Sequence, residues 1–215
     1  MSNHKTVLLV NTHLTYPNWS EGALNKSFQE KAKDFFKFNG YEVLETIVEN
    51  GYRPAEEVEK HLRADIVILQ TPVNWFGAPW IYKKYVDEVF NAGLFSKKFQ
   101  EADGRSADDP SRQYGTGGKM YGKKFMVSAT WNAPRAAFGD PDQVLMQGKT
   151  TADLFLNLTS SYHFVGYEIM PDYGTFDIFR DQKIEQDLQN YPLHLAKAFE
   201  LKIEETIADE TKIEL

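Results

Sequence analysis

The sequence predicts an α/β protein with a doubly wound, five-stranded parallel sheet and helices on both faces. One observation is the run TVLLVN at residues 6–11, which is apolar almost throughout rather than alternating. Such a run is typical of a parallel strand that is buried on both faces. A second observation is that similar runs alternate along the chain with segments of helical periodicity. This alternation is the order of βαβ units, and it indicates an open parallel sheet.

The individual elements follow from the same patterns. Strands are expected at residues 6–11, 41–47, 66–69, 125–130 and 167–170. Helices are expected at residues 24–38, 55–64, 79–92 and 152–164. Asn39 and Gly40 supply a stop for the first helix. Pro54 suits the start of the second, and Gly93 is expected to end the third. A last amphipathic helix is expected where apolar residues recur every four positions, at Leu195, Phe199, Ile203 and Ile207.

The stretch at residues 97–124 breaks this alternation, because it has few core-forming residues and no clear period. It holds seven Lys or Arg and four Asp or Glu, in a chain whose net charge is -7. A lid that contacts an anionic group and a solvated excursion both fit this pattern. The length of 215 residues predicts a single domain over residues 1–215. The break in the pattern adds an irregular insert at about 94–123.

Composition excludes several classes of function. The chain has no Cys, which excludes disulfides, thiolate catalysis and Cys-based metal sites. No apolar stretch approaches the roughly 20 residues of a membrane span, so no membrane insertion is expected. The N-terminus indicates a first strand rather than a signal peptide, so a cytoplasmic protein is expected. The negative net charge argues against non-specific nucleic-acid binding.

Three loops are expected to form a ligand site. Ligands of such sheets bind beyond the carboxyl ends of the strands. This rule selects residues 12–23, 71–79 and 131–143, which are rich in Trp, Pro and Gly. Each loop holds one tryptophan, namely Trp19, Trp75 and Trp131 in chain order. A loop that only connected two elements would be short and polar. The three loops together favour a bound ligand.

Known phosphate and metal motifs do not fit the chain. Residues 148–150 read GKT, but position 143 is Gln143 instead of the glycine that a P-loop needs. Gly115 and Gly117 lie in the insert and so do not form a dinucleotide fingerprint. The five His are scattered, and no metal site is expected. What remains is indoles, phenols, amides and loop N–H groups, which suit a planar cofactor that performs the reaction itself, such as a flavin.

Three linked motifs extend this interpretation: QTPVNWFGAPWIYKKYVDEVF at residues 70–90, DGRSADDPSRQYGTGG in the insert, and SATWNAP after the fourth strand. Together they resemble the FAD-dependent NAD(P)H:quinone reductases, and more closely the bacterial "modulator of drug activity B" branch. The resemblance covers nearly the whole chain and implies a flavodoxin-like fold.

The resemblance also implies a role for individual residues. The FAD pyrophosphate would meet the first loop and the start of its helix, at Ser20, Gly22, Ala23 and Leu24. The isoalloxazine would lie along Pro72, Val73, Asn74, Trp75 and Phe76, with Gly77 allowing a tight turn. Its other edge would meet Thr130, Trp131, Asn132 and Ala133, and the insert would add Tyr114. Catalytic roles would fall to Tyr114, Trp131 and Asn132. Glu21 stands where the family commonly has Asn, and a carboxylate beside a pyrophosphate is unfavourable unless it points away.

The implied reaction is a ping-pong transfer of two electrons from NADPH or NADH, through bound FAD, to a small-molecule quinone. The resemblance further implies a homodimer whose insert lies at the interface, with sites shared between subunits. Three alternatives stay open: an FMN-dependent azoreductase, a one-electron flavodoxin-type carrier, and a non-catalytic sensor of nicotinamide or flavin. The first loop, THLTYPNWSEGA, lacks the hydroxyl-rich pattern T-x-T-G-x-T of the one-electron carriers.

Overall fold

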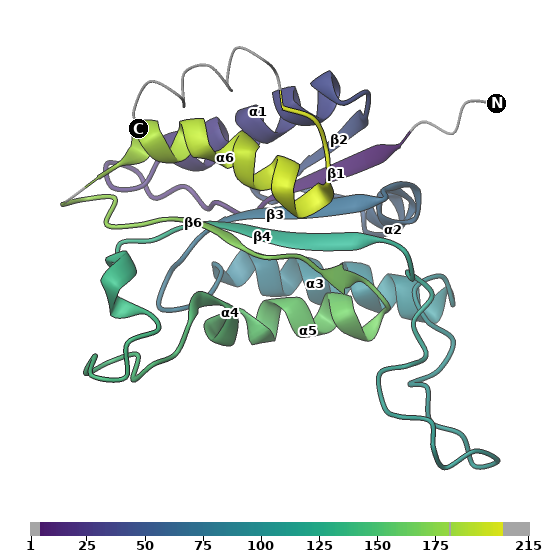
Figure 1. Ribbon diagram of the computed structural model, residues 1–215. Helices are drawn as coiled ribbons and strands as arrows, with labels where there is room; N and C mark the ends of the chain where they lie inside the picture. The colour runs from purple at the N-terminus through teal and green to yellow at the C-terminus, as the bar shows by residue number, and fades with distance from the viewer. Residues whose placement is uncertain (1–4, 181, 204–215) are drawn as a thin grey trace.

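A computed structural model describes residues 5–180 and 182–203. Its described strands form one sheet in the order β2-β1-β3-β4-β5, with a further strand, β6, that also pairs with β4 (Figure 1). Every strand pairing is parallel. The bounds are β1 (Thr6–Asn11), β2 (Glu42–Ile47), β3 (Ile66–Pro72), β4 (Lys124–Thr130), β5 (Glu168–Ile169) and β6 (Tyr173–Thr175). The predicted doubly wound parallel sheet is therefore confirmed.

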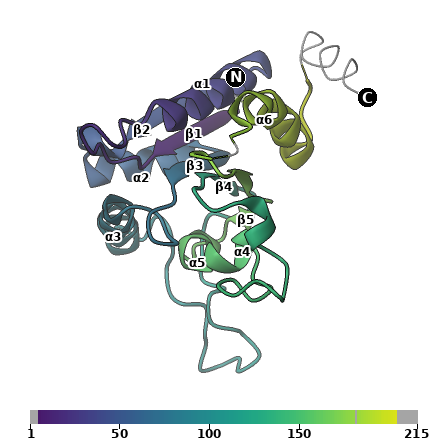
Figure 2. The same cartoon turned by 90° about the vertical axis from the view of Figure 1, so that its left-hand side faces the viewer.

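Helices cover both faces of this sheet. The longer ones are α1 (Ala23–Phe38), α2 (Pro54–Arg63), α3 (Trp80–Phe95), α5 (Leu156–Phe164) and α6 (Ile184–Phe199). A single turn, α4 (Thr151–Leu154), and two 3-10 turns, η1 (Val48–Asn50) and η2 (Arg135–Ala137), complete the set. Helices α1 and α6 lie on one face, whereas α3, α4 and α5 lie on the other (Figures 1 and 2).

Side chains that alternate along the central strands divide the core in two. On β1, Leu8 and Val10 pack into the cluster beneath α2, α3 and α5, whereas Val7 and Leu9 pack into the cluster beneath α1 and α6. All six residues of β1 are buried, which explains the continuous apolar run in the sequence. Both faces of β1 are thus apolar, and its polar residues, Thr6 and Asn11, stand at its two ends.

The last predicted strand and three predicted helix ends need correction. The strand expected at residues 167–170 is shorter, and β6 follows it as a separate strand. Gly93 lies inside α3 and does not end it. A glycine is needed there because an added Cβ would stand 2.4 Å from the ring of Phe99. The helix expected at residues 152–164 is interrupted at Phe155, which packs its ring into the core. Helix α6 ends before Glu200, whose φ of 56° is left-handed. Ile203 therefore lies beyond the helix, and Ile207 lies outside the described residues.

The insert joins the end of α3 to the start of β4, so it leaves the sheet at the amino ends of the strands (Figure 1, lower right). Close backbone contacts fix its base. A Cβ on Gly117 would lie 1.8 Å from the Ala102 carbonyl oxygen, and one on Gly118 would lie 2.2 Å from the carbonyl carbon of Val165. The base of the insert is therefore packed rather than solvated. Over the residues that the structure covers, no helix has the length and apolar character needed to cross a bilayer.

Candidate functional site

The loops that follow β1, β3, β4 and β6 meet at the carboxyl edge of the sheet, which Figure 2 turns toward the viewer. Backbone hydrogen bonds join the start of each loop to the end of the neighbouring strand at this edge. The Thr12 N–H donates to the Gln70 carbonyl at 3.0 Å, and the Val73 N–H donates to the Thr130 carbonyl at 2.9 Å. The structure thus brings the three loops selected from the sequence to one edge.

The first loop ends in an uncapped helix start. Gly22 stands before α1 in a left-handed conformation, with φ 82°, and no side chain of the described chain caps the helix. The first turn contains no acidic residue. Free N–H groups and the helix dipole make such an end attractive to anions. Ala23 and Leu24, expected at the pyrophosphate, are the first two residues of this turn. Glu21 is exposed immediately before it.

The buried side chain of His13 contacts this loop. The sequence analysis did not assign it to the site. Its Nε2 lies 3.1 Å from Ser20 Oγ, and its backbone N–H donates to Asn11 Oδ1 at 2.9 Å. The side chain is only 6% exposed. Burial lowers the pKa of His13, against the opposing effects of the Glu49 carboxylate and the Ser20 backbone. A histidine two residues after the end of a buried strand was the available signal.

A buried cluster of amides and hydroxyls lies beneath the edge. The Gln70 side chain donates to Asn25 Oδ1 at 2.9 Å, and Asn11 donates to Gln29 Oε1 at 2.8 Å. Four buried side-chain atoms have no hydrogen-bond partner within residues 5–180 and 182–203, and two of them, Thr12 Oγ1 and Gln70 Oε1, belong to this cluster. Unpaired buried polar atoms cost free energy, so they indicate unmet binding capacity. The signal in the sequence was that apolar strands end in amide residues.

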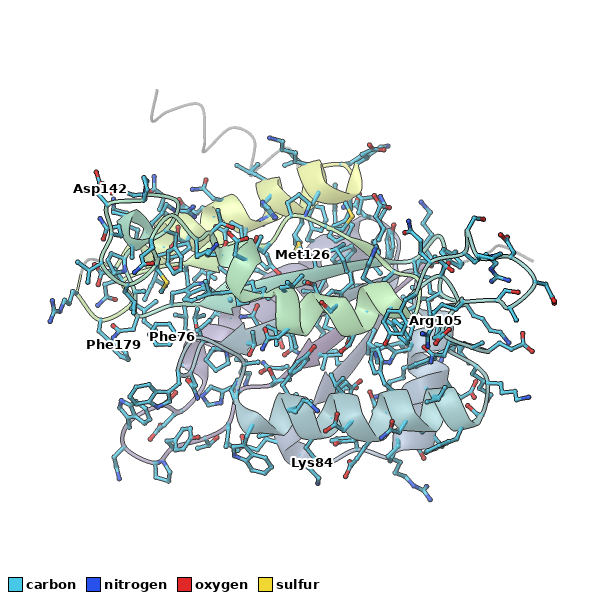
Figure 3. The ribbon with its side chains drawn as sticks, turned by 90° about the horizontal axis from the view of Figure 1, so that it is seen from below. Phe76, Lys84, Arg105, Met126, Asp142 and Phe179 are labelled. Carbon is cyan, nitrogen blue, oxygen red and sulfur yellow. The ribbon has the colours of Figure 1, made fainter. Side chains whose placement is uncertain are left out.

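The second loop is a tight turn with strained aromatic residues at its tip. Asn74 and Gly77 pair by two backbone hydrogen bonds, of 2.8 and 3.2 Å. Trp75 and Phe76 between them have φ of 51° and 69°. Bulky side chains rarely adopt this left-handed region, and such strain gathers at functional sites. Trp75 is 95% exposed, and Phe76 is 46% exposed (Figure 3 labels Phe76).

The expectation for Gly77 is wrong. It was expected to allow the tight turn, but the positive φ values fall on Trp75 and Phe76, and a Cβ on Gly77 would meet no atom closer than 4.0 Å. Trp80, which begins α3, is 65% exposed, so it does not belong to the core. Pro72 ends β3 as a buried residue beside the turn.

The third loop exposes the side-chain amide of Asn132 and buries the indole of Trp131. Trp131 is 1% exposed and packs among aromatic rings, at 4.9 Å from Phe138 and 5.2 Å from Phe155. Its backbone N–H already donates to Thr175 at 2.8 Å. Neither the indole face nor this N–H is therefore open to a ligand in this conformation. Asn132 is exposed beyond it and Ala133 is half-buried, whereas Thr130 is buried.

Tyr114 does not join the other expected site residues. Its ring packs 5.0 Å from Phe164 and under the Arg105 guanidinium at 5.5 Å, and 67% of the residue is exposed. Arg105 and Phe76 lie at opposite ends of the molecule (Figure 3). The reason is topological, since the insert precedes β4 while the other loops follow strands. Within one chain, Tyr114 is remote from the carboxyl edge.

The family model described as the flavodoxin-like fold matches residues 5–195. The chain belongs to this flavodoxin-like family. It is 39% identical over 183 residues to the NADPH:quinone oxidoreductase MdaB of Haemophilus influenzae, covering 84% of this chain and 92% of that relative. The expected relationship to quinone reductases of the MdaB branch is therefore confirmed, as is the expectation of an oxidoreductase enzyme.

Solved structures show the flavodoxin-like fold as well. A Klebsiella pneumoniae protein described as a quinone reductase has a TM-score of 0.68 at 19% identity, over 91% of this chain and 84% of that one. General stress protein 14 of Treponema denticola, in complex with FMN, has a TM-score of 0.60 at 17% identity, over 90% of this chain and 99% of that one. At such identities the likeness concerns the fold alone.

The carboxyl edge of this flavodoxin-like chain fits a flavin nucleotide. The uncapped start of α1 offers N–H groups to phosphate. The exposed Asn132 side chain offers an amide to a polar ring edge, whereas the unpartnered oxygens of Thr12 and Gln70 are buried at the strand ends. The exposed rings of Trp75 and Phe76 offer apolar surface for stacking. The donor set thus combines phosphate, polar-edge and ring-face contacts at one edge.

Proposed function

We propose that this chain is a flavin-dependent NAD(P)H:quinone oxidoreductase. The observation that carries the proposal is the 39% identity to MdaB, which extends over 84% of the chain. The carboxyl edge supports it independently, because its phosphate, polar-edge and ring-face contacts match a flavin nucleotide. Ionisable groups suited to acid–base catalysis are not needed for this chemistry.

FAD is the proposed cofactor, and it would supply the two-electron chemistry when bound, receiving hydride from a nicotinamide and passing both electrons to a quinone in a ping-pong cycle. The start of α1, with Ser20 and Gly22, would hold the pyrophosphate. The turn at Trp75 and Phe76 would line the ring and limit the access of water. Asn132, exposed on the third loop, would orient the polar edge of the ring and stabilise charge that develops there.

The remoteness of Tyr114 supports a shared site in a homodimer. A cavity of about 390 Å³ between α3 and α5 reaches Tyr114 and Phe164, and the nearby Phe95 is 82% exposed. We propose that a second copy of the chain covers this face and that Tyr114 serves the partner's site. NADPH is the proposed reductant, because the name of the Haemophilus influenzae relative specifies it.

The first test identifies the cofactor. The purified protein is denatured and any released flavin is identified by mass, and the reconstituted holoenzyme is then assayed with NADPH, NADH and a soluble quinone. FAD together with quinone turnover is the expected result. FMN with azo-dye turnover would favour the azoreductase alternative. Failure to bind either flavin would contradict the proposal.

A second test addresses the shared site. Gly22→Val should abolish cofactor binding, because φ at this position is 82° and a Cβ would stand 2.6 Å from His13 Nδ1. Tyr114→Ala should impair turnover while flavin stays bound. Subunits of the two variants are mixed after mild dissociation. Recovered turnover is expected, because a mixed dimer contains one complete site. An absence of recovery, with mixed dimers detected by light scattering and mass, would show that Tyr114 does not act across subunits.

A further inference from the structure

His13 touches both ends of the segment that leads into α1. The loop folds back on itself, since Tyr16 and Ser20 exchange backbone hydrogen bonds of 2.9 and 2.8 Å. His13 Nε2 then reaches Ser20 Oγ at 3.1 Å. The histidine is itself fixed by its own N–H, which donates to Asn11 at the end of β1. A rigid strand end is thereby connected to an irregular loop through one imidazole ring.

The same ring packs against the glycine that begins the helix. A Cβ on Gly22 would lie 2.6 Å from Nδ1, 2.8 Å from Cε1 and 3.0 Å from Cγ of His13. The ring therefore fills the space where a side chain at position 22 would stand. Because Gly22 also has a left-handed φ of 82°, both its neighbour and its conformation require glycine.

The protonation state of the ring decides what Ser20 can do. Burial lowers the pKa of His13, so the ring is neutral near pH 7 and has one N–H. Nδ1 is covered by Gly22, and Nε2 faces the serine. If Nε2–H donates to Ser20 Oγ, the serine proton is free to be donated outward. In the other tautomer Nε2 would accept the Ser20 proton and leave the hydroxyl without a donor.

We infer that His13 is a positioning residue for cofactor phosphate: its Nε2–H donates to Ser20 Oγ, which directs the serine O–H to a phosphate oxygen, while its ring supports Gly22 at the start of α1. The inference rests on the proposed flavin function and adds a residue that the resemblance did not assign. It also accounts for a buried histidine in a site that otherwise contains few ionisable groups. His13 acts through Ser20 and Gly22, and it does not touch the reacting ring.

The test compares ligands with and without phosphate. Apo-protein of each variant is titrated with FAD and with riboflavin, and binding is followed by the quenching of flavin fluorescence. His13→Leu should weaken FAD binding about tenfold, the effect of losing one hydrogen bond to a charged group. Riboflavin binding should change less than about twofold, since it has no phosphate. His13→Gln should restore most of the FAD affinity, because its amide can donate to Ser20.

Two further variants keep the test decisive if His13→Leu folds poorly. Ser20→Ala should weaken FAD binding to a similar extent. Combining it with His13→Gln should add little, because any effect of the side chain at position 13 on the phosphate is transmitted through Ser20. His194→Gln is the matched control. That histidine is also partly buried, bonds the Pro171 carbonyl at 3.0 Å, and has its pKa lowered by burial. It should leave both affinities unchanged.

The outcomes separate this inference from the proposed function. Equal weakening of FAD and riboflavin in His13→Leu, or no loss of FAD affinity in Ser20→Ala, would show that His13 serves the fold alone. A wild-type chain that binds neither flavin would contradict the proposed function, and the inference with it. A wild-type chain that binds FAD while all variants match it would contradict the inference only.

Discussion

Two buried polar clusters in this molecule differ in how completely their side chains are hydrogen-bonded. Beneath α2, the Glu57 carboxylate accepts hydrogen bonds from Thr46 and Tyr85, each at 2.8 Å, and pairs with Lys60 at 2.7 Å. The adjacent His61 bonds the Glu57 carbonyl through Nδ1 at 2.9 Å. Each of these contacts satisfies a buried group within the chain.

The cluster at the carboxyl edge is incomplete by comparison. Thr12 Oγ1 and Gln70 Oε1 lack partners among the described residues, although both side chains are buried. The neighbouring turn also holds Trp75 and Phe76 in a left-handed conformation. Unpaired polar atoms and backbone strain both lower stability, and they persist where a ligand relieves them. This difference is what we expect if the first cluster serves the fold and the second is organised for the proposed ligand.

The largest expected effect on stability comes from removing the central carboxylate of the cluster beneath α2. Glu57→Leu should lower the free energy of unfolding by about 4 kcal/mol, because it leaves Tyr85 and the Lys60 ammonium without their buried partner. Urea denaturation of the apo-protein measures this loss, and flavin affinity of the folded fraction should not change. Glu56→Leu on the exposed side of the same helix is the control, with an expected change below about 0.5 kcal/mol. Similar losses in both variants would contradict the assignment.

Acid should destabilise the same cluster through His61. Desolvation by burial lowers the pKa of His61 from 6.5 to about 4. The unfolded chain therefore takes up a proton below pH 6.5 that the folded chain refuses until about pH 4. Stability is unaffected above pH 6.5 and falls as pH drops from 6.5 to 4, by about 3 kcal/mol in total. The free energies of unfolding measured by urea denaturation at pH 7 and pH 4 should therefore differ by about 3 kcal/mol less in His61→Gln than in the wild type. Equal pH dependence in the two proteins would rule out His61 as the cause.

These clusters also show what the sequence could predict. Apolar runs identify β1, β3 and β4, because strands buried on both faces are apolar along most of their length. The short strands β5 and β6 are less visible, since two or three residues carry no period. The ends of the helices were less predictable, because they depend on contacts formed in the folded chain. Gly93, for example, lies inside α3 and leaves space for the ring of Phe99, which lies beyond the helix.

The candidate site was predictable at the level of loops and less so at the level of side chains. Strand order places the loops at the carboxyl edge, so their meeting follows from topology. The burial of Trp131 depends on rings from Phe138 and Phe155, which no local pattern reveals. The distance of Tyr114 from the edge follows from the insert preceding β4 rather than following it. His13 was overlooked because its partners, Ser20 and Gly22, are brought to it only by the folded loop.

Relieving strain at the edge should stabilise the protein at the expense of activity. The double substitution Trp75→Asn with Phe76→Gly supplies the residues that a two-residue turn with two positive φ values prefers. The free energy of unfolding should rise by about 2 kcal/mol, as the left-handed strain of two bulky residues is removed. Quinone turnover should fall, because the aromatic wall is lost. The matched control is Trp80→Asn, which removes an exposed indole from helical backbone and should not raise stability.

The smallest expected effect on stability is the sharpest test of the comparison. Thr12→Val keeps the shape of a fully buried side chain and removes a hydroxyl that has no partner within the described chain. Apo-protein stability should stay the same or rise by up to about 1 kcal/mol, since an unpaired buried oxygen is replaced by a methyl group. Flavin affinity should fall at the same time. Thr46→Val, in the satisfied cluster, is the counterpart and should lose stability without losing flavin, because its hydroxyl bonds Glu57. If Thr12→Val instead destabilised the apo-protein as Thr46→Val does, the hydroxyl at the edge would belong to the fold, and the two clusters would not differ in kind.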